Sequence, residues 1–241
     1  APKGASRTMY LDDKGNVVDG KSLFTHYAVG VPGTVAGMTH ALTRWGSMPL
    51  PTVMAPAIAL AEKGYPVSAT LAKTLSQEQK TLSRWPATQA IFWKNGAPLQ
   101  AGEQLVQKDL AQSLRLISQQ GAKAFYQGAI AQKIAAEMAP HAKAITLQDL
   151  RDYKVVEREP VRGTYRGYQI VTMPPPSSGG AHLLQILNMM ERWPLQQWGA
   201  NSAQSVHHMT EAMKLVYADR AEYLGDPDFV KIPLQGLISR R

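Results

Sequence analysis

The pattern that most constrains this chain is a succession of short amphipathic segments, each ended by glycine or proline. After Pro32-Gly33-Thr34, apolar side chains recur every three or four residues on one helix face, and Gly46 follows them. The next segment, about residues 51–63, stops at Gly64. Strong strand-like sequence occurs only near residues 161–172. The chain is therefore predicted to have an α+β fold that is mainly helical.

Other local signals extend this helical pattern. Ser68 is an N-cap candidate for a helix that ends at Pro86. Asn95-Gly96 predicts a small hairpin, and Thr146-Leu147-Gln148-Asp149 resembles a capping box with Asp in place of Glu. Further helices are expected near residues 108–120, 128–139, 179–191 (capped by Ser178) and 202–224 (stopped by Gly225).

The two strand-like runs, residues 161–164 and 168–172, have few obvious partners in this sequence. A two-stranded sheet is marginal by itself, so we expect these strands to join a larger sheet completed by residues outside this chain. Residues 1–241 are interpreted as one domain fragment. It would comprise a helical region at about residues 30–160 and a strand and helix contribution at about residues 161–241.

Composition excludes several classes of protein. Hydrophobic residues make up 44% and charged residues 18% of the chain, which argues against disorder. The net charge of +8 is spread evenly, without the basic stripe typical of a nucleic-acid binder. The absence of cysteine excludes disulfides, thiolate nucleophiles and iron–sulfur clusters. The first residues, APKGASRTMYLDD, lack the apolar stretch of a signal peptide, and no membrane span is predicted.

Two motifs invite a ligand-binding interpretation that their spacing does not favour. Residues 30–37 are glycine-rich, but the spacing does not fit a dinucleotide-binding loop, so the start of a helix is favoured. His207 and Glu211 share a helix face beside His208, yet one His and one carboxylate make a weak metal site. A polar helix face is the favoured interpretation, and we predict no metal ligands.

Two further stretches leave structural and functional interpretations open. Asp219 or Asp226 could act as a general base, whereas the structural alternative is an Asp219–Arg220 ion pair and an Asp-Pro turn. In residues 173–182, three prolines force an extended backbone before two serines and two glycines start a helix. The amides at that start could bind an anion, or Ser178 could cap them.

These two stretches also carry a resemblance to a known family. MPPPSSGG at residues 173–180 and YADRAEYLGDPDF at residues 217–229 resemble segments of the large subunit of bacterial gamma-glutamyltranspeptidase. VPGTVAG at residues 31–37 is similar to a third segment of that family. Further similar segments, at residues 9–13, 45–50, 90–94 and 165–168, occur in the family's order and spacing. The resemblance covers essentially residues 1–239.

The resemblance implies an acyl-transfer enzyme of glutathione metabolism. Members of the family cleave the gamma-glutamyl bond of glutathione and related compounds and transfer the glutamyl group to water, amino acids or peptides. They are zymogens that cut themselves into a large and a small subunit. The new N-terminal Thr of the small subunit is the nucleophile, and its α-amino group can act as the base. The implied fold is an N-terminal-nucleophile sandwich of two sheets between helical layers, and the implied location is periplasmic or secreted.

This chain resembles the middle of the large subunit. The Arg-Glu pair that the family places before the Ala-Pro matching Ala1-Pro2 is not in the sequence, nor is the nucleophilic Thr, which is expected beyond Arg241. We therefore assign no catalytic, substrate-binding or metal residue, and no cofactor. The implied partners are the small subunit and a gamma-glutamyl substrate. The residues expected to give structural support near the pocket are Ser177, Ser178, Gly179, Gly180, Asp219 and Arg220.

Two alternatives to this interpretation remain at the level of sequence. One is a non-enzymatic helical binding or interaction module derived from the same family. The other is an unrelated enzyme whose site would combine His182, His207 and Asp219. The first interpretation carries its own expectation: part of the surface should be apolar where it packs on the rest of the enzyme, so the isolated fragment should be less stable or prone to associate.

Overall fold

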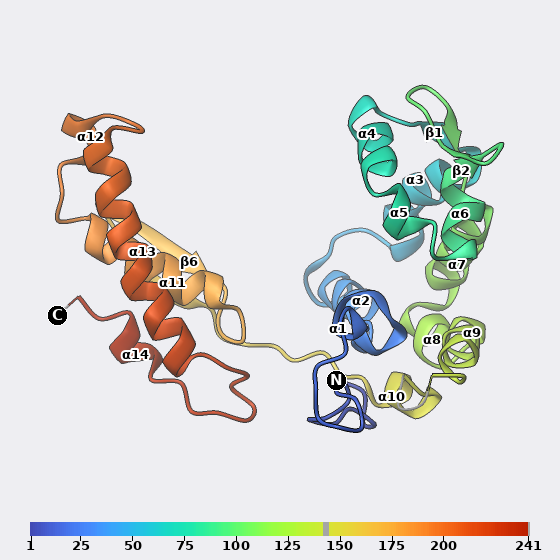
Figure 1. Ribbon diagram of the computed structural model, residues 1–241, viewed down its shortest axis with the longest axis horizontal. Helices are drawn as coiled ribbons and strands as arrows, with labels where there is room; N and C mark the ends of the chain where they lie inside the picture. Colours follow the sequence, from blue (N-terminus) through green and yellow to red (C-terminus); the bar gives the residue numbers. More distant parts are fainter. Residues whose placement is uncertain (142–144, 241) are drawn as a thin grey trace. The chain divides into compact units, whose positions relative to one another are not determined.

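The computed structural model describes residues 1–141 and 145–240. The chain divides into two compact units, Ala1–Val155 and Val156–Arg241 (Figure 1). Their boundary lies a few residues before the change from helical to strand-like sequence predicted at about residue 161. The interpretation of residues 1–241 as one domain stays a prediction.

The first two long helices of the first unit have limits that were predicted to within one residue. α2 (Thr34–Trp45) ends where the N–H of Gly46 donates to the preceding turn, and α3 (Leu50–Lys63) ends at Gly64, which has a φ of 80°. Both stop signals are local in sequence, which is why they could be recognised. Two short elements precede these helices: α1 (Lys21–Phe24) and the 3-10 helix η1 (His26–Ala28).

The helix predicted between Ser68 and Pro86 is wrong in its second half. Ser68 does cap α4 (Ala69–Gln77), because its hydroxyl accepts a hydrogen bond from the N–H three residues on. The chain then breaks at Glu78, and Pro86 begins α6 (Pro86–Phe92) instead of ending a helix. Proline is tolerated at a first helical position because the N–H there has no helical partner. The short α5 (Gln79–Leu82) separates the two.

The rest of the first unit consists of small strand pairs and further helices. Asn95 and Gly96 form the predicted hairpin turn, with φ values of 52° and 81°. The capping box of Thr146 and Asp149 is present, whereas the short helix α8 was not predicted. The remaining elements are β1 (Tyr65–Pro66) paired with β4 (Gln104–Leu105), β2 (Trp93–Lys94) paired with β3 (Ala97–Pro98), α7 (Lys108–Gln120), α8 (Ala122–Tyr126), α9 (Ala129–Met138) and α10 (Leu147–Asp152).

Two clusters of buried side chains form the interior of the first unit. One is built on Val67, Leu75, Leu99 and Leu105, and the other on Tyr126, Ala131, Ile145 and Leu150. The Tyr126 hydroxyl donates to the Pro32 carbonyl at 2.7 Å and accepts from the Ala36 N–H at 3.2 Å. It thereby holds the start of α2, which confirms that the glycine-rich residues 30–37 lead into a helix.

Within residues 156–240, the second unit contains one antiparallel hairpin and four helices. β5 (Val161–Tyr165) pairs with β6 (Tyr168–Thr172) in the register Val161↔Thr172 to Tyr165↔Tyr168. The strands thus have each other as partners, and Arg166-Gly167, both at positive φ, makes the turn. Each strand pairs on one side only among the described residues. The helices are α11 (Ser178–Met190), α12 (Leu195–Trp198), α13 (Ala203–Tyr223) and α14 (Leu234–Leu237).

α11 covers one face of the hairpin and lies beside α13 (Figure 1). Its N-cap corrects one prediction: the cap is Ser177, whose hydroxyl accepts from the Gly179 N–H at 3.3 Å, and Ser178 is the first helical residue. α13 is capped by Ser202, at the residue expected to begin that helix.

Large apolar side chains remain exposed in both units. Met38 and Trp45 on α2 are 69% and 66% exposed, and Phe229 after α13 is 85% exposed. On α13, Val216 is buried but Tyr217 is open to solvent, so the apolar side chains of this helix are only partly covered. None of the helices in the described part of the chain combines the length and apolar character that a bilayer span requires.

Candidate functional site

The candidate support residues gather where α11 and α13 face each other. On α11, Ser178, His182 and Gln185 are spaced by four and three residues, so they lie on one side of the helix. On α13, Asp219 and Arg220 meet this side. We call these five residues the polar seam.

Two hydrogen bonds close the polar seam. Gln185 Nε2 donates to Asp219 Oδ2 at 2.7 Å, and Arg220 Nε donates to Ser178 Oγ at 3.3 Å. Consecutive residues of α13 therefore reach two different turns of α11. The structure brings Ser178, Asp219 and Arg220 together, and the carboxylate and the guanidinium bind α11 rather than forming the alternative Asp219–Arg220 ion pair.

Two polar atoms of the seam are buried without a hydrogen-bond partner: His182 Nε2 and Gln185 Oε1. Burial lowers the pKa of His182, the neighbouring Arg220 guanidinium lowers it further, and the Asp219 carboxylate opposes both effects. Because the pKa in the folded state lies below 6.5, the neutral imidazole is the form that the fold favours.

The seam should therefore make stability depend on pH. Below about pH 6.5 the unfolded state binds a proton at His182 that the folded state resists, so the free energy of unfolding should fall between pH 7.5 and 5.5. In His182→Gln this loss should shrink, because glutamine does not titrate. Urea unfolding at both pH values measures the effect. His207→Gln, at an exposed site on α13, is the control and should keep the full pH dependence.

Because Gly180 has no side chain, the extended segment that precedes α11 can lie directly against the first turn of the helix. A Cβ built on Gly180 would stand 1.9 Å from the Met173 carbonyl oxygen, within the extended segment that precedes the helix. A Cβ on Gly179 would find only Ser177 Oγ, at 3.5 Å. Gly180 is buried and Gly179 is exposed, so only Gly180 of the pair is required by packing.

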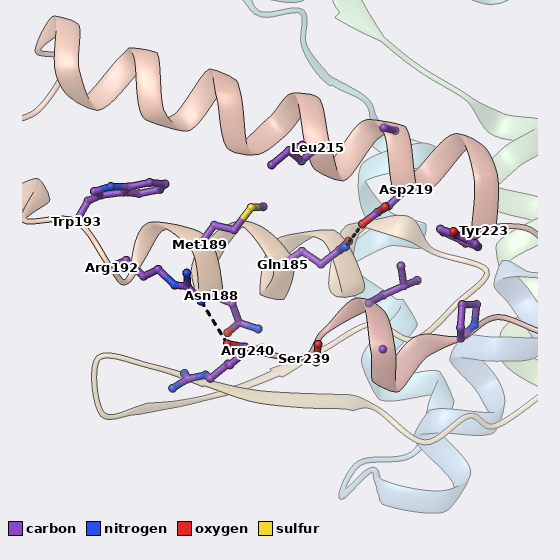
Figure 2. A pocket seen from close by; sticks show the side chains of 14 residues that line it. Gln185, Asn188, Met189, Arg192, Trp193, Leu215, Asp219, Tyr223, Ser239 and Arg240 are labelled. Carbon is purple, nitrogen blue, oxygen red and sulfur yellow. Dashed lines mark hydrogen bonds between the residues drawn. The ribbon is translucent and has the colours of Figure 1, made fainter.

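A groove with a volume of 810 Å³ opens beside the polar seam (Figure 2). Met189 of α11 and Leu215 of α13 face it from opposite sides, and the Gln185–Asp219 hydrogen bond lies at its wall. The segment that follows α14 closes another side, where Arg240 lies. The groove thus has a mixed apolar and polar lining.

The other candidate residues do not assemble into a second site. His208 packs against Trp198 with ring centroids 4.5 Å apart, and Glu211 pairs with Lys214 at 3.0 Å. Among residues 1–141 and 145–240 there is no group of three possible metal ligands. The favoured interpretation of this stretch as a polar helix face agrees with these contacts.

The alternative site of His182, His207 and Asp219 is not formed. His207 and Asp219 are twelve residues apart on α13, which places them about 18 Å apart along the helix axis. Asp226 makes the Asp-Pro turn: its carboxylate accepts from the Asp228 N–H at 3.0 Å and its carbonyl accepts from the Phe229 N–H at 2.9 Å.

Gln185 was not predicted as a member of this site. Its partner, Asp219, lies 34 positions away, so no local motif joins them. A usable signal was present, because polar residues 178, 182 and 185 form a stripe at helical spacing on an otherwise apolar helix.

Comparisons with known proteins agree with one another. The family model for gamma-glutamyltranspeptidase matches residues 1–241. The chain is 50% identical to the glutathione hydrolase proenzyme of Escherichia coli K12, covering all of this chain and 42% of that protein. It is 41% identical to the acylase ACY 1 proenzyme of Pseudomonas sp. strain V22, covering 95% and 40%. The crystal structure of Helicobacter pylori gamma-glutamyltranspeptidase superposes with a TM-score of 0.95 at 45% identity, covering 100% of this chain and 69% of that one. The chain thus spans about two fifths of the length of these curated relatives.

Proposed function

The chain belongs to the gamma-glutamyltranspeptidase family, and on that premise we propose that it forms the central part of the large subunit of a gamma-glutamyltransferase, or glutathione hydrolase. The observation that carries the proposal is the family match over all 241 residues, together with the superposition on a gamma-glutamyltranspeptidase structure. Its fold is α+β, mainly helical, and of the N-terminal-nucleophile hydrolase class, as expected. We propose that residues outside this chain complete the sandwich.

The complete enzyme would cleave gamma-glutamyl bonds and pass the glutamyl group to water, an amino acid or a peptide. The attacking hydroxyl would be supplied by the N-terminal Thr of the small subunit, whose own α-amino group takes the proton. The residues of this chain would then act by maintaining the shape of the pocket, since none of them is assigned to contact the reacting atoms. The curated relatives of Escherichia coli and Pseudomonas are called proenzymes, which supports a precursor that is processed into two chains.

We assign the supporting role to Ser177, Ser178, Gly179, Gly180, Asp219 and Arg220. The contacts described above favour it: Ser177 caps α11, Gly180 admits the extended approach, and α13 binds α11 through the polar seam. The exposed apolar side chains of both units favour a further partner surface, which we assign to the small subunit and the rest of the precursor. The periplasm or the exterior of the cell is the proposed location.

Self-cleavage and turnover of the full-length precursor test the proposal together. We expect a chromogenic gamma-glutamyl anilide to be hydrolysed, and mass spectrometry of the same sample to find two polypeptides, one of which begins with Thr. The isolated 241-residue chain is the control and should be inactive. A precursor that stays whole and inactive would contradict the proposal and favour a non-enzymatic interaction module. Activity of the isolated chain would place a nucleophile within these 241 residues.

A further inference from the structure

The segment after α14 returns to the hairpin and to the end of α11. Asn188 Nδ2 donates to the Ile238 carbonyl at 2.9 Å. Arg192 Nη2 donates to the Arg240 carbonyl at 3.3 Å (Figure 2). Two side chains that project from the last turn of α11 and just beyond it thus bind the backbone of residues 238–240. The path of this segment is therefore fixed by side-chain contacts as well as by packing.

The Arg240 side chain adds a second set of contacts. Its Nη2 donates to the carbonyl and the hydroxyl of Thr164 at 2.5 and 2.8 Å and pairs with Glu191 Oε2 at 3.0 Å. The other carboxylate oxygen of Glu191 accepts from the Arg166 N–H at 2.5 Å. Glu191 therefore joins the hairpin turn to the returning segment. We call Thr164, Arg166, Glu191 and Arg240 the clasp.

We expect the contacts of the clasp to orient the backbone at residue 240 more than they stabilise the fold. An isolated exposed ion pair contributes little to folding. Here each charged group has more than one partner, and the planar guanidinium fixes the direction of each hydrogen bond it donates. An arrangement of this kind sets where the backbone at residue 240 lies and where the chain beyond it is directed.

We propose that Glu191 and Arg240 are positioning residues for self-cleavage of the precursor, because they anchor the chain that leads to the cleavage junction. This inference rests on the proposed function. In that step a peptide bond is hydrolysed with one water: the upstream chain gains a carboxylate and the downstream Thr gains a free α-amino group. The clasp does not contact the reacting atoms, and it acts by shortening the free chain between a fixed point and the junction.

The size of the effect follows from chain closure. Doubling the length of a free tether lowers the probability that its end reaches a given point about threefold. Without the Glu191 carboxylate, the hairpin turn and the Arg240 side chain lose their common partner, whereas Asn188 and Arg192 still hold the backbone of residues 238–240. The chain therefore loses its direction more than its last fixed point, and we expect Glu191→Ala to slow self-cleavage of the full-length precursor by up to about threefold.

The test follows conversion of the precursor on denaturing gels, at several protein concentrations to confirm a first-order, intramolecular rate. Glu211→Ala is the matched control, because Glu211 forms an exposed ion pair with Lys214 on α13 and is not part of the clasp. Glu191→Gln, which keeps the size and one acceptor oxygen, serves if the alanine variant folds poorly. Arg240→Gln should slow cleavage similarly, and the Glu191→Gln, Arg240→Gln double variant should be no slower than either single variant.

A positioning role also predicts a separation of two rates. Enzyme assembled from two separately expressed chains bypasses cleavage, so its hydrolysis of the gamma-glutamyl anilide should be the same with and without Glu191→Ala. Cleavage of the Glu191→Ala precursor at the wild-type rate, or an equal loss in turnover of the preassembled enzyme, would overturn the inference. Failure of the wild-type precursor to cleave would instead overturn the proposed function.

Discussion

Gly180→Ala is expected to destabilise the protein by about 3 kcal/mol, near the upper end of the range for overpacking. The added methyl carbon would stand 1.9 Å from the Met173 carbonyl oxygen and 2.9 Å from its carbonyl carbon. Both atoms belong to the backbone, so no side-chain rotation relieves the overlap. Either the extended approach or the first turn of α11 must move, and the contacts of the polar seam move with it.

The neighbouring glycine supplies the matched control for this substitution. In Gly179→Ala the new methyl carbon meets only Ser177 Oγ, at ordinary contact distance, so the change in stability should stay within about 0.5 kcal/mol. Urea unfolding of the two variants measures the difference directly. Equal unfolding free energies would mean that the approach to α11 yields easily and that Gly180 is not required there. In the full-length precursor, Gly180→Ala should also lower the yield of processed enzyme.

The second large effect is expected at Asp149, in the first unit. Its buried carboxylate accepts from the Lys3 N–H at 2.7 Å, the Thr146 N–H at 2.9 Å and the Thr146 hydroxyl at 2.6 Å. Asp149→Ala leaves these donors without their charged acceptor and removes half of the capping box. Hydrogen bonds to a charged group are worth more than neutral ones, so we expect a loss of about 2–3 kcal/mol.

Asp152→Ala is the control for Asp149→Ala. Asp152 lies three residues on, is exposed, and pairs with the Lys3 ammonium, so its loss should cost much less stability than the loss of Asp149. Thermal or urea unfolding distinguishes the two variants. A cost at Asp152 equal to that at Asp149 would show that the Lys3 side chain, and not the backbone bonds to the carboxylate, holds the N-terminal segment.

The contribution of the Asp149 carboxylate to stability should also appear as a loss of stability at low pH. Burial by itself would raise the pKa of Asp149, but the hydrogen bonds from Lys3 and Thr146 outweigh it and leave the pKa below 3.8. The stability contributed by Asp149 is therefore complete above the unfolded-state value and is lost as the pH falls through 3.8 toward the folded-state value. Asp149→Ala should remove this part of the acid transition.

The parts of the fold that sequence predicted are those specified by neighbours in the chain. The capping box at Thr146, the stop at Gly64 and the Asn95-Gly96 turn each act within a few residues. The prediction was wrong where two local signals compete. Ser177 and Ser178 are both possible caps of α11, and Pro86 can either end one helix or begin the next. Choosing between such alternatives depends on what each segment packs against.

Three members of the polar seam, Ser178, Asp219 and Arg220, were singled out from the sequence, but their contacts were not predicted. Asp219 and Arg220 were singled out, yet their partners on α11 are 34 and 42 positions away, at distances no local pattern encodes. The clasp was not predicted either, because Arg240 meets Thr164 across 76 positions. Contacts between residues so far apart in the sequence can be recognised only when the positions of the helices and strands in space are known.

The hairpin of the second unit also has a consequence for the time before assembly. In the part of the chain that the structure describes, each of its strands pairs on one side, so backbone N–H and C=O groups face outward along both edges of the β5–β6 pair. An exposed edge of this kind pairs with compatible strands, including those of another newly synthesised molecule of the same chain. Between synthesis and completion of the sheet, pairing with the correct strand therefore competes with pairing with a strand of another molecule. Because the second process depends on the concentration of unassembled chains, faster production of the chain favours aggregation.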